Sequence, residues 1–507
     1  MSFATLYSRA LIGVEAVQVT VETHLSNGLP GFAIVGLPET AVKESKERVR
    51  SAIINSGLDF PTRRITVNLA PADIPKAGGR YDLAIALSIL AASGQLDINK
   101  LDCLEILGEL ALDGSVRSVQ GVIPAILAAR TAQRELILPR ANQREIELAH
   151  YGSVLAVENL IGLCESLQSE SGFKLEESPR KPPACPEPPS FKEFTVQGQL
   201  LAKRAIQIAA AGGHNLLMVG PPGCGKSLLA QVMVRLLPAL NEEQALEVAA
   251  IRSISEQKLN SGDFWQRPIR SPHHSATAVA LVGGGNRASP GEISLAHHGI
   301  LFLDELAEFK PSVLDSLREP METGRITISR ANYQVVFPAR FQLLAAMNPC
   351  PCGHATDSRV ECRCSPDRVS RYLGKLSGPL LDRIDLIVEM ASLSRQELLS
   401  RSEATEDWEA IRQRVAHCQA TQTARQGKLN TDLLQLELDE YCQLNSKLEN
   451  LLANAMDSLG LSARTVHRIL RVARTLADLD EQSVIAEGHL LQAIGFRKSV
   501  LNPSLAA

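Results

Sequence analysis

The sequence predicts a multidomain α/β protein, and three observations support this fold class. The chain has 507 residues, 45% of them hydrophobic, which suffices for about three domains of roughly 150 residues each. A glycine-rich loop stands between an apolar run, HNLLMV, and a helical pattern, LLAQVMVRLL, as in a strand, loop and helix of a parallel sheet. Apolar residues at helical spacing fill the last segment. The expected parts are an α+β domain at 1–170, a proline-rich linker at 171–190, an α/β core at 191–390 and a helical region at 391–507.

The glycine-rich loop, GPPGCGKS at 220–227, has the G-x-x-x-x-G-K-[ST] pattern of a phosphate-binding loop. Its glycines allow backbone N–H groups to close around phosphates, Lys226 reaches the β- and γ-phosphates, and Ser227 is predicted to hold magnesium. ATP and Mg²⁺ are therefore the expected cofactors. The predicted nucleotide contacts are Gly220, Pro221, Pro222, Gly223, Cys224, Gly225, Lys226, Ser227 and Leu228.

A second apolar run, ILFL at 300–303, ends in Asp304 and Glu305. A buried parallel strand would deliver both carboxylates to the open end of the sheet, beside the phosphate loop. Asp304 then suits magnesium binding, and Glu305 suits activation of the attacking water. The alternative is a glycine- and proline-rich turn and an unrelated acidic turn.

Charge and composition limit the partners. A formal net charge of −4 excludes a wholly basic surface that coats nucleic acid, so any DNA contact is expected to be local. We expect a cytoplasmic protein without a membrane partner, because no basic head precedes an apolar core at the start and no run of about 18 apolar residues follows. The ten cysteines fit reduced thiols or a metal site better than a disulfide framework.

The first domain combines strand and helix patterns. Alternation at 14–25 predicts a strand, 39–57 predicts an amphipathic helix ending at Gly57, and 104–119 predicts a hairpin that turns at Asp113–Gly114. We expect the linker at 171–190 to be semi-rigid and to hold this domain away from the core.

The stretches NLAPADIPKAGGRYDLAIALSIL and GELALDGSVRSVQGVIPAILAA resemble the proteolytic domain of Lon-type proteases. The positions of the family's serine and lysine correspond to Arg80 and Ile123, which cannot supply a nucleophile and its base. The domain is therefore expected to lack protease activity. It would serve instead as a scaffold, an oligomerisation platform or a DNA-contacting collar.

Further motifs in the core resemble the ring-forming AAA+ ATPases. In this family QLLAAMNPC would end in a first sensor, Asn348, and LLDRID would carry an arginine finger, Arg383, that completes the neighbouring subunit's site. The alternative for Arg383 is a surface salt bridge with Asp382 or Asp385. The stretch LSARTVHRILRVAR offers Arg464 as the second sensor.

Arg468 and Arg471 compete with Arg464 for that role. With Arg474, these arginines are expected to share one helix face, where one contacts nucleotide and the others face a neighbouring subunit or water.

Two insertions are expected to form hairpins in a ring lumen. The first, at 271–299, is rich in glycine and small residues, and the second, at 325–341, turns near Ala331 and Asn332. Arg330, Asn332 and Tyr333 at its tip are the predicted DNA contacts, because a cation and an aromatic ring suit the backbone and the bases of a single strand. A solvated turn is the alternative. The insertions resemble the AAA+ branch that contains magnesium-chelatase ATPase subunits and MCM helicases.

Four cysteines lie close together in the core, as C-x-C, nine residues and C-x-C. Cys350, Cys352, Cys362 and Cys364 predict a structural Zn²⁺ site, with free thiols in a loop as the alternative. The histidine pairs in SPHH and AHHG are interpreted as pore-loop or surface residues rather than metal ligands.

Taken in order, these motifs make nearly the whole chain similar to the ComM/YifB family. The resemblance implies a homo-hexameric, ATP-driven motor with single-stranded and branched DNA in its lumen. Such a motor would promote branch migration during natural transformation, with recombinase proteins as partners. Two alternatives stay open: a magnesium-chelatase-type ATPase that acts on a partner enzyme, and a chaperone or protease regulator.

Overall fold

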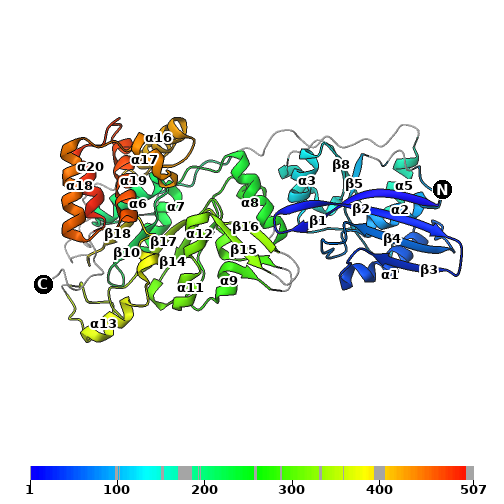
Figure 1. Cartoon of the computed structure of the whole chain (residues 1–507), viewed down its shortest axis with the longest axis horizontal. Coiled ribbons are helices and arrows are strands. Elements are labelled where there is room, and N and C mark those ends of the chain that lie inside the picture. The colour runs from blue at the N-terminus through cyan, green and yellow to red at the C-terminus, as the bar shows by residue number, and fades with distance from the viewer. Residues whose placement is uncertain are drawn as a thin grey trace. The chain divides into compact units, whose positions relative to one another are not determined.

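The computed structural model describes residues 2–97, 101, 103–149, 153–169, 185–191, 193–194, 196–255, 260–285, 288–329, 334–357, 359–392 and 406–497 (Figure 1). The chain divides into two compact units. The first contains Met1–Pro186, Asn241–Gln266 and Ser329–Phe337, and the second contains Glu187–Leu240, Arg267–Ile328 and Pro338–Ala507.

The first unit is built on a mixed seven-stranded sheet in the order β3-β4-β2-β1-β5-β8-β9. Its long central strands, β1 and β2, pair antiparallel with Leu6 opposite Val21, and both side chains are fully buried. The alternation at 14–25 predicted β2, whereas β1 was not predicted. The strands are β1 (Phe3–Ile12), β2 (Glu15–Ser26), β3 (Gly31–Val35), β4 (Arg64–Ala70), β5 (Leu104–Ile106), β8 (Glu135–Pro139) and β9 (Val154–Val157).

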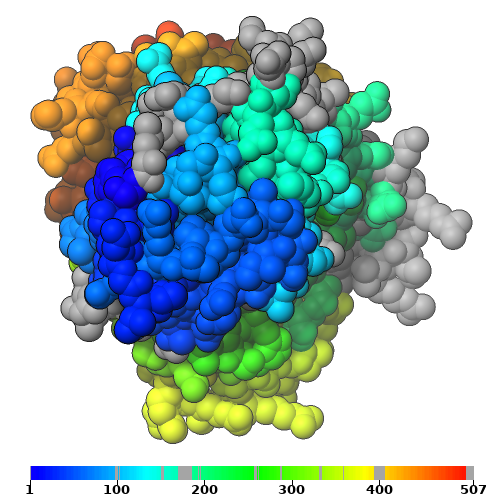
Figure 2. Space-filling view, turned by 90° about the vertical axis from the view of Figure 1, so that its right-hand side faces the viewer, coloured from blue at the N-terminus to red at the C-terminus, as the bar shows by residue number. Residues whose placement is uncertain are grey.

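Helices and a small hairpin complete the N-terminal part of this unit, whose blue residues occupy the face turned to the viewer in Figure 2. The predicted helix that stops at Gly57 is confirmed, and the turn at Asp113–Gly114 joins β6 (Glu109–Leu110) to β7 (Val116–Arg117). The helices are α1 (Thr40–Asn55), α2 (Asp82–Ala92), α3 (Val122–Thr131), α4 (Gln143–Ala149) and α5 (Leu160–Gln168).

The two positions that correspond to the Lon serine and lysine are both buried. Arg80 lies just before α2, and burial lowers the pKa of its guanidinium. Ile123 lies in α3, with its side chain in the core of the first unit. A buried guanidinium and a buried aliphatic side chain do not form a nucleophile and base.

Two segments that the sequence placed in the core fold with the first unit instead. Helix α8 (Glu242–Ile254) packs on α3, and the N–H of Gly121 donates to the carbonyl of Ser253 at 2.7 Å. Close packing also joins Gly13 to the second hairpin, because a Cβ on Gly13 would lie 2.7 Å from Cγ1 of Val335. Helix α8 and the strand that contains Val335 therefore belong to the packing of the first unit. Most of the predicted linker lies outside the described residues.

The second unit contains a five-stranded parallel sheet in the order β11-β14-β17-β10-β18. Because the strands are parallel, the carboxyl ends of β10, β14 and β17 lie at the same edge. Gly220, Asp304 and Asn348, which directly follow these three strands, are therefore brought together. The strands are β10 (Leu216–Val219), β11 (Ile269–Arg270), β14 (Ile300–Leu303), β17 (Gln342–Met347) and β18 (Leu386–Glu389).

The predicted helical region forms a lid that shares one hydrophobic cluster with the sheet. In Figure 1 its helices gather on one side of the second unit, where α16 and α19 pack on α6. The helices concerned are α6 (Leu200–Gly212), α7 (Lys226–Leu236), α16 (Trp408–Gln426), α17 (Gln435–Tyr441), α18 (Ser446–Leu459), α19 (Ala463–Leu479) and α20 (Glu487–Gly495).

The insertion at 271–299 contains the expected hairpin, which is short and is flanked by two helices that were not predicted. A short antiparallel pair, β12 (Gly283–Gly284) with β13 (Ser289–Pro290), stands between helices α9 (Ala278–Val282) and α10 (Glu292–Leu295). Local chemistry explains the helices. The hydroxyl of Thr277 caps α9 at the N–H of Ala280, and Arg270 binds both carboxylate oxygens of Glu292 in α10.

Shorter helices follow the acidic strand and the cysteine segment: α11 (Pro311–Asp315), α12 (Arg318–Thr323), α13 (Pro366–Leu373) and α14 (Gly378–Leu381). The second insertion forms the predicted hairpin of β15 (Arg325–Ser329) and β16 (Gln334–Pro338). Among the described residues, no helix is both long and apolar enough to span a bilayer.

Candidate nucleotide-binding site

The phosphate loop connects β10 to the N-terminus of α7, as predicted. Gly223 and Gly225 have φ values of +78° and +97°, a backbone conformation that is unstrained only for glycine. Gly225 is also the N-cap of α7, so the free N–H groups and the positive dipole end of this helix face the loop. The local fold is therefore that of an anion cradle.

Lys226 lies inside this loop and is 9% exposed. Its Nζ donates to the carbonyls of Gly220 at 2.7 Å and Pro221 at 2.9 Å, and to Oδ1 of Asn348 at 3.1 Å. Burial lowers the pKa of the Lys226 amine. The structure thus brings together the lysine and the predicted first sensor, which are far apart in sequence.

Ser227 and Asp304 also meet at this edge of the sheet. The Ser227 hydroxyl donates to Oδ2 of Asp304 at 3.0 Å, and Oδ1 of Asp304 accepts the N–H of Glu305 at 2.9 Å. A hydroxyl and a carboxylate at this separation fit Mg²⁺, which prefers oxygen ligands.

Glu305 has a histidine partner that the sequence did not predict. Nδ1 of His274 lies 3.0 Å from Oε2 of Glu305, and the rings of His273 and His274 are tilted by 35° with their centroids 4.0 Å apart. Glu305 itself has a φ of +53°, a strained conformation for a residue with a side chain. The SPHH motif was noticed in the sequence, but nothing in its spacing linked it to a glutamate 31 positions later.

The two predicted phosphate-sensing arginines, Arg383 and Arg464, both reach Glu322 in α12. Nη2 of Arg383 donates to Oε2 of Glu322, and Nη2 of Arg464 lies 3.9 Å from Oε1 of the same carboxylate. Arg383 thus forms an ion pair within the protomer, as the alternative supposed, but with Glu322 rather than with Asp382 or Asp385, and Asp385 pairs with Arg468.

The other lid arginines have internal partners, which corrects the expectation that they face a neighbouring subunit or water. Arg468 pairs with the buried Asp385, Arg471 donates to the carbonyl of Leu433 at 2.6 Å, and Arg474 pairs with Asp478. Arg468 therefore holds the lid to the sheet, and Arg471 holds two segments of the lid together. Arg464, with its side chain 69% exposed, is the most accessible of the row.

A buried histidine also joins the lid to the sheet. Nε2 of His214 lies 2.8 Å from Oγ1 of Thr475 in α19, and Nδ1 lies 3.9 Å from Oδ2 of Asp385. Burial lowers the pKa of His214 to about 4, so this side chain is neutral near pH 7. No motif in the sequence pointed to His214, which stands just before β10.

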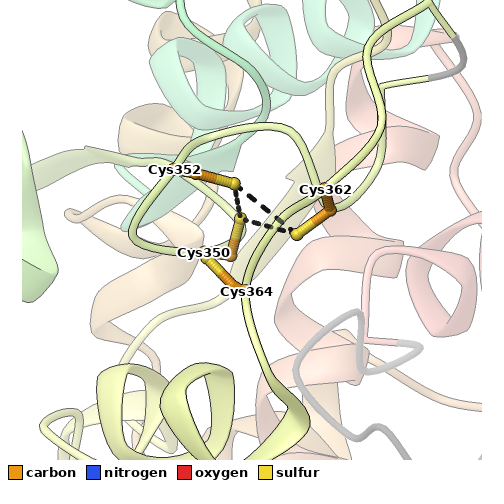
Figure 3. A group of neighbouring side chains, drawn as sticks. All are labelled: Cys350, Cys352, Cys362 and Cys364. Carbon is orange, nitrogen blue, oxygen red and sulfur yellow. Dashed lines mark hydrogen bonds between the residues drawn. The ribbon is translucent and has the colours of Figure 1, made fainter.

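The four predicted metal ligands form one cluster, drawn in Figure 3. The sulfur atoms of Cys350, Cys352, Cys362 and Cys364 all lie within 4.8 Å of one another. Three of the separations are 3.3, 3.5 and 3.7 Å. A tetrahedral zinc with Zn–S bonds of about 2.3 Å requires sulfur atoms about 3.8 Å apart, so this donor set fits Zn²⁺. The backbone N–H of His354 lowers the pKa of the Cys352 thiol to about 6, which favours a thiolate there, whereas burial and the neighbouring cysteines raise the pKa values of Cys362 and Cys364.

The cysteine cluster adjoins the phosphate loop. A Cβ on Gly353, between two of the ligands, would lie 2.8 Å from Cδ of Pro222, and Asn348 precedes Cys350 by only two residues. The order of this loop therefore bears on the position of the first sensor.

The predicted DNA contacts Arg330, Asn332 and Tyr333 lie outside the described residues. The strands beside them are described, and Val335 and Phe337 of β16 are buried. The base of this hairpin is therefore held by packing.

Three family models match the chain. The description "Magnesium chelatase, subunit ChlI" covers residues 193–398, "Subunit ChlI of Mg-chelatase" covers 21–142, and "Magnesium chelatase, subunit ChlI C-terminal" covers 405–497. Along the chain, the three matches fall on the predicted first domain, the predicted α/β core and the predicted helical region.

Relatives of two kinds match the chain, some over nearly its full length and others over part of it. Competence protein ComM of Haemophilus influenzae is 48% identical over 99% of this chain and 98% of its own. The uncharacterized protein YifB of Escherichia coli is 47% identical over 98% of this chain and 97% of its own. The magnesium-chelatase 38 kDa subunit of Acidiphilium rubrum is 26% identical, over 58% of this chain and 86% of its own.

Proposed function

The chain belongs to the ComM/YifB family of magnesium-chelatase-like AAA+ proteins, and we propose that it is a hexameric, ATP-driven DNA motor. It would promote branch migration during recombination in natural transformation, in the cytoplasm. The observation that carries the proposal is the similarity to competence protein ComM across both the first domain and the motor.

The geometry at the sheet edge supports ATP hydrolysis, which the family implies. Lys226 and the backbone of the phosphate loop would bind the phosphates, and Asn348 would orient the attacking water next to them. Mg²⁺ bound by Ser227 and Asp304 would neutralise charge on the phosphates. Glu305 would accept the proton of the water. Arg383 would complete the site of the neighbouring subunit.

Zn²⁺ would be held by Cys350, Cys352, Cys362 and Cys364, with a structural role. Cross-linking the loop at both ends would keep its start, and with it Asn348, in place. In this proposal the first domain is a non-proteolytic platform, consistent with the burial of Arg80 and Ile123.

The test is ATP-dependent strand displacement from a synthetic three-strand branched junction. We expect the native chain to displace the strand and Lys226→Ala to fail, because loss of the ammonium removes phosphate binding. Glu319→Gln, an exposed change in α12, serves as control. Brisk ATP hydrolysis without displacement would refute the DNA motor and leave the ATPase.

The second candidate is a protein-remodelling ATPase of the magnesium-chelatase type, favoured by the match to the 38 kDa subunit. The two functions differ in their salt dependence. Single-stranded DNA should stimulate hydrolysis by a DNA motor, and the stimulation should fall steeply with salt because phosphate contacts release counterions. A remodelling ATPase would respond to its protein partner and not to DNA.

A further inference from the structure

One carboxylate in α12 is shared by both predicted phosphate-sensing arginines. Each oxygen of Glu322 has its own guanidinium, Oε2 that of Arg383 and Oε1 that of Arg464. The three residues come from three separate elements: α12 after the acidic strand, the turn after α14, and the first turn of the lid helix α19. Glu322 therefore links α12 to the turn after α14 and to the lid helix α19.

Both terminal nitrogens of Arg383 donate a hydrogen bond within the protomer. Nη1 donates to the carbonyl of Pro379 at 2.8 Å, Nη2 donates to Glu322, and Nε is buried without a hydrogen-bond partner among the described residues. The Arg383 side chain is 13% exposed, whereas that of Glu322 is 55% exposed. An incoming anion would therefore reach this cluster at the carboxylate and would compete with it.

A phosphate is the natural competitor. Carboxylates and phosphates both bind the guanidinium fork through two oxygens, and the terminal phosphate of ATP carries more charge than a carboxylate. The main-chain oxygen of Arg383 is fixed independently, by Nη1 of Arg468 at 3.0 Å and by the amide of Asn215 at 3.0 Å. The backbone would thus stay in place while the side chain changes partner.

We propose that Glu322 is a positioning residue that holds Arg383 and Arg464 together and gives way to the nucleotide phosphates of the neighbouring subunit. The inference rests on the proposed trans-acting role of Arg383 and deepens it. Glu322 sets the nucleotide concentration at which the two arginines leave the protomer's own carboxylate. Arg464 then acts on the same face as Arg383.

The measurement is ATP hydrolysis by the full chain as a function of ATP concentration, without DNA. Glu322→Gln keeps the shape of the side chain but removes the competing charge. We expect its half-saturating ATP concentration to fall by about threefold or more, the size that loss of a partly exposed ion pair allows. The maximal rate should be at least that of the native chain. ATP-dependent assembly, followed by sedimentation, should shift to lower ATP by a similar factor.

Three further variants make the result specific. Glu319→Gln removes a charge one turn earlier on α12 and should behave as the native chain. Glu322→Asp keeps the carboxylate and should restore the native half-saturation. In the Arg383→Ala background, Glu322→Gln should no longer shift ATP-dependent assembly.

An unchanged half-saturating ATP concentration in Glu322→Gln would overturn the proposal. If the maximal rate fell at the same time, Glu322 would only support Arg383 in the assembled ring. These outcomes are read from hydrolysis and assembly alone. Failure of strand displacement would refute the DNA motor and leave this test readable.

Discussion

At the residue scale, Lys226 and Glu305 should separate binding from turnover. Lys226→Ala removes the ammonium held at the phosphate loop, so ATP binding should be lost. Glu305→Gln leaves that loop intact and removes the base, so ATP should bind with near-native affinity while turnover falls by about a hundredfold or more. Equilibrium binding of a fluorescent ATP analogue, beside steady-state hydrolysis, measures both. Loss of binding in Glu305→Gln would contradict the assignment.

His214 makes a prediction about stability against pH. Its folded pKa of about 4 lies below the ordinary value, so the unfolded chain binds more protons between about pH 6.5 and pH 4. The stability linked to this residue is therefore complete above pH 6.5 and is lost on acidification. From pH 7 to pH 5 the free energy of unfolding should fall by about 2 kcal/mol through His214 alone.

The check is thermal and denaturant unfolding of the native chain and of His214→Gln at both pH values. The acid-induced loss should be smaller in His214→Gln. His417→Gln, an exposed histidine on α16, should retain the native dependence. Equal losses in all three proteins would mean that His214 is not the titrating group.

At the scale of elements, the cysteine loop should behave as a metal-bound staple. Purified protein should contain about one zinc per chain, and a strong chelator should remove it together with ATP hydrolysis, since Asn348 stands at the start of the loop. Cys362→Ser should lose the metal and hydrolysis, whereas Cys103→Ser, an exposed cysteine of the first unit, should lose neither. Full hydrolysis in metal-free Cys362→Ser would show that zinc is not needed to hold Asn348 in place.

The sequence predicts elements whose residues are neighbours along the chain. The strand, loop and helix around Lys226 follow from one continuous pattern, and the strand that precedes Asp304 follows from another. Because neighbouring strands of this sheet are parallel, their carboxyl ends lie at the same edge, which brings Asp304 to the phosphate loop. The pairs His274 with Glu305 and Glu322 with Arg383 could not be predicted. They join side chains of separate elements, and the hydrophobic periodicity of an element does not indicate which other element its polar side chains will contact.

At the scale of the whole molecule, the same limit applies to the assignment of α8 and β16. Both carry ordinary amphipathic patterns that predict an element but not the unit on which it packs. Their apolar sides pack with the first unit, as the close approach of Gly13 to Val335 indicates. Removal of residues 1–170 should therefore leave an aggregation-prone motor rather than a free one.

Gly121 tests that packing directly. It has a φ of +67°, and a Cβ there would lie 2.2 Å from Cδ1 of Leu11 in β1 and 3.1 Å from Cγ2 of Ile254 in α8. Gly121→Ala should destabilise the first unit by about 2 to 4 kcal/mol, combining the backbone strain with the clash. Gly57 has a φ of +73°, and a Cβ there would have nothing within 4 Å. Gly57→Ala therefore measures the cost of the backbone strain alone. Equal unfolding temperatures for the two variants would show that Leu11 yields without cost.

The ring itself can be tested by mixing two inactive variants. Arg383→Ala subunits keep their own phosphate loop but give their neighbour no arginine, whereas Lys226→Ala subunits give the arginine but bind no nucleotide. In a ring with head-to-tail interfaces, a site is complete where an Arg383→Ala subunit supplies the loop and a Lys226→Ala subunit supplies the arginine. At equal mixing about a quarter of the interfaces meet this condition. ATP hydrolysis should therefore reappear on mixing. Two variants that stay inactive together, under conditions where they assemble, would place Arg383 in the protomer's own site.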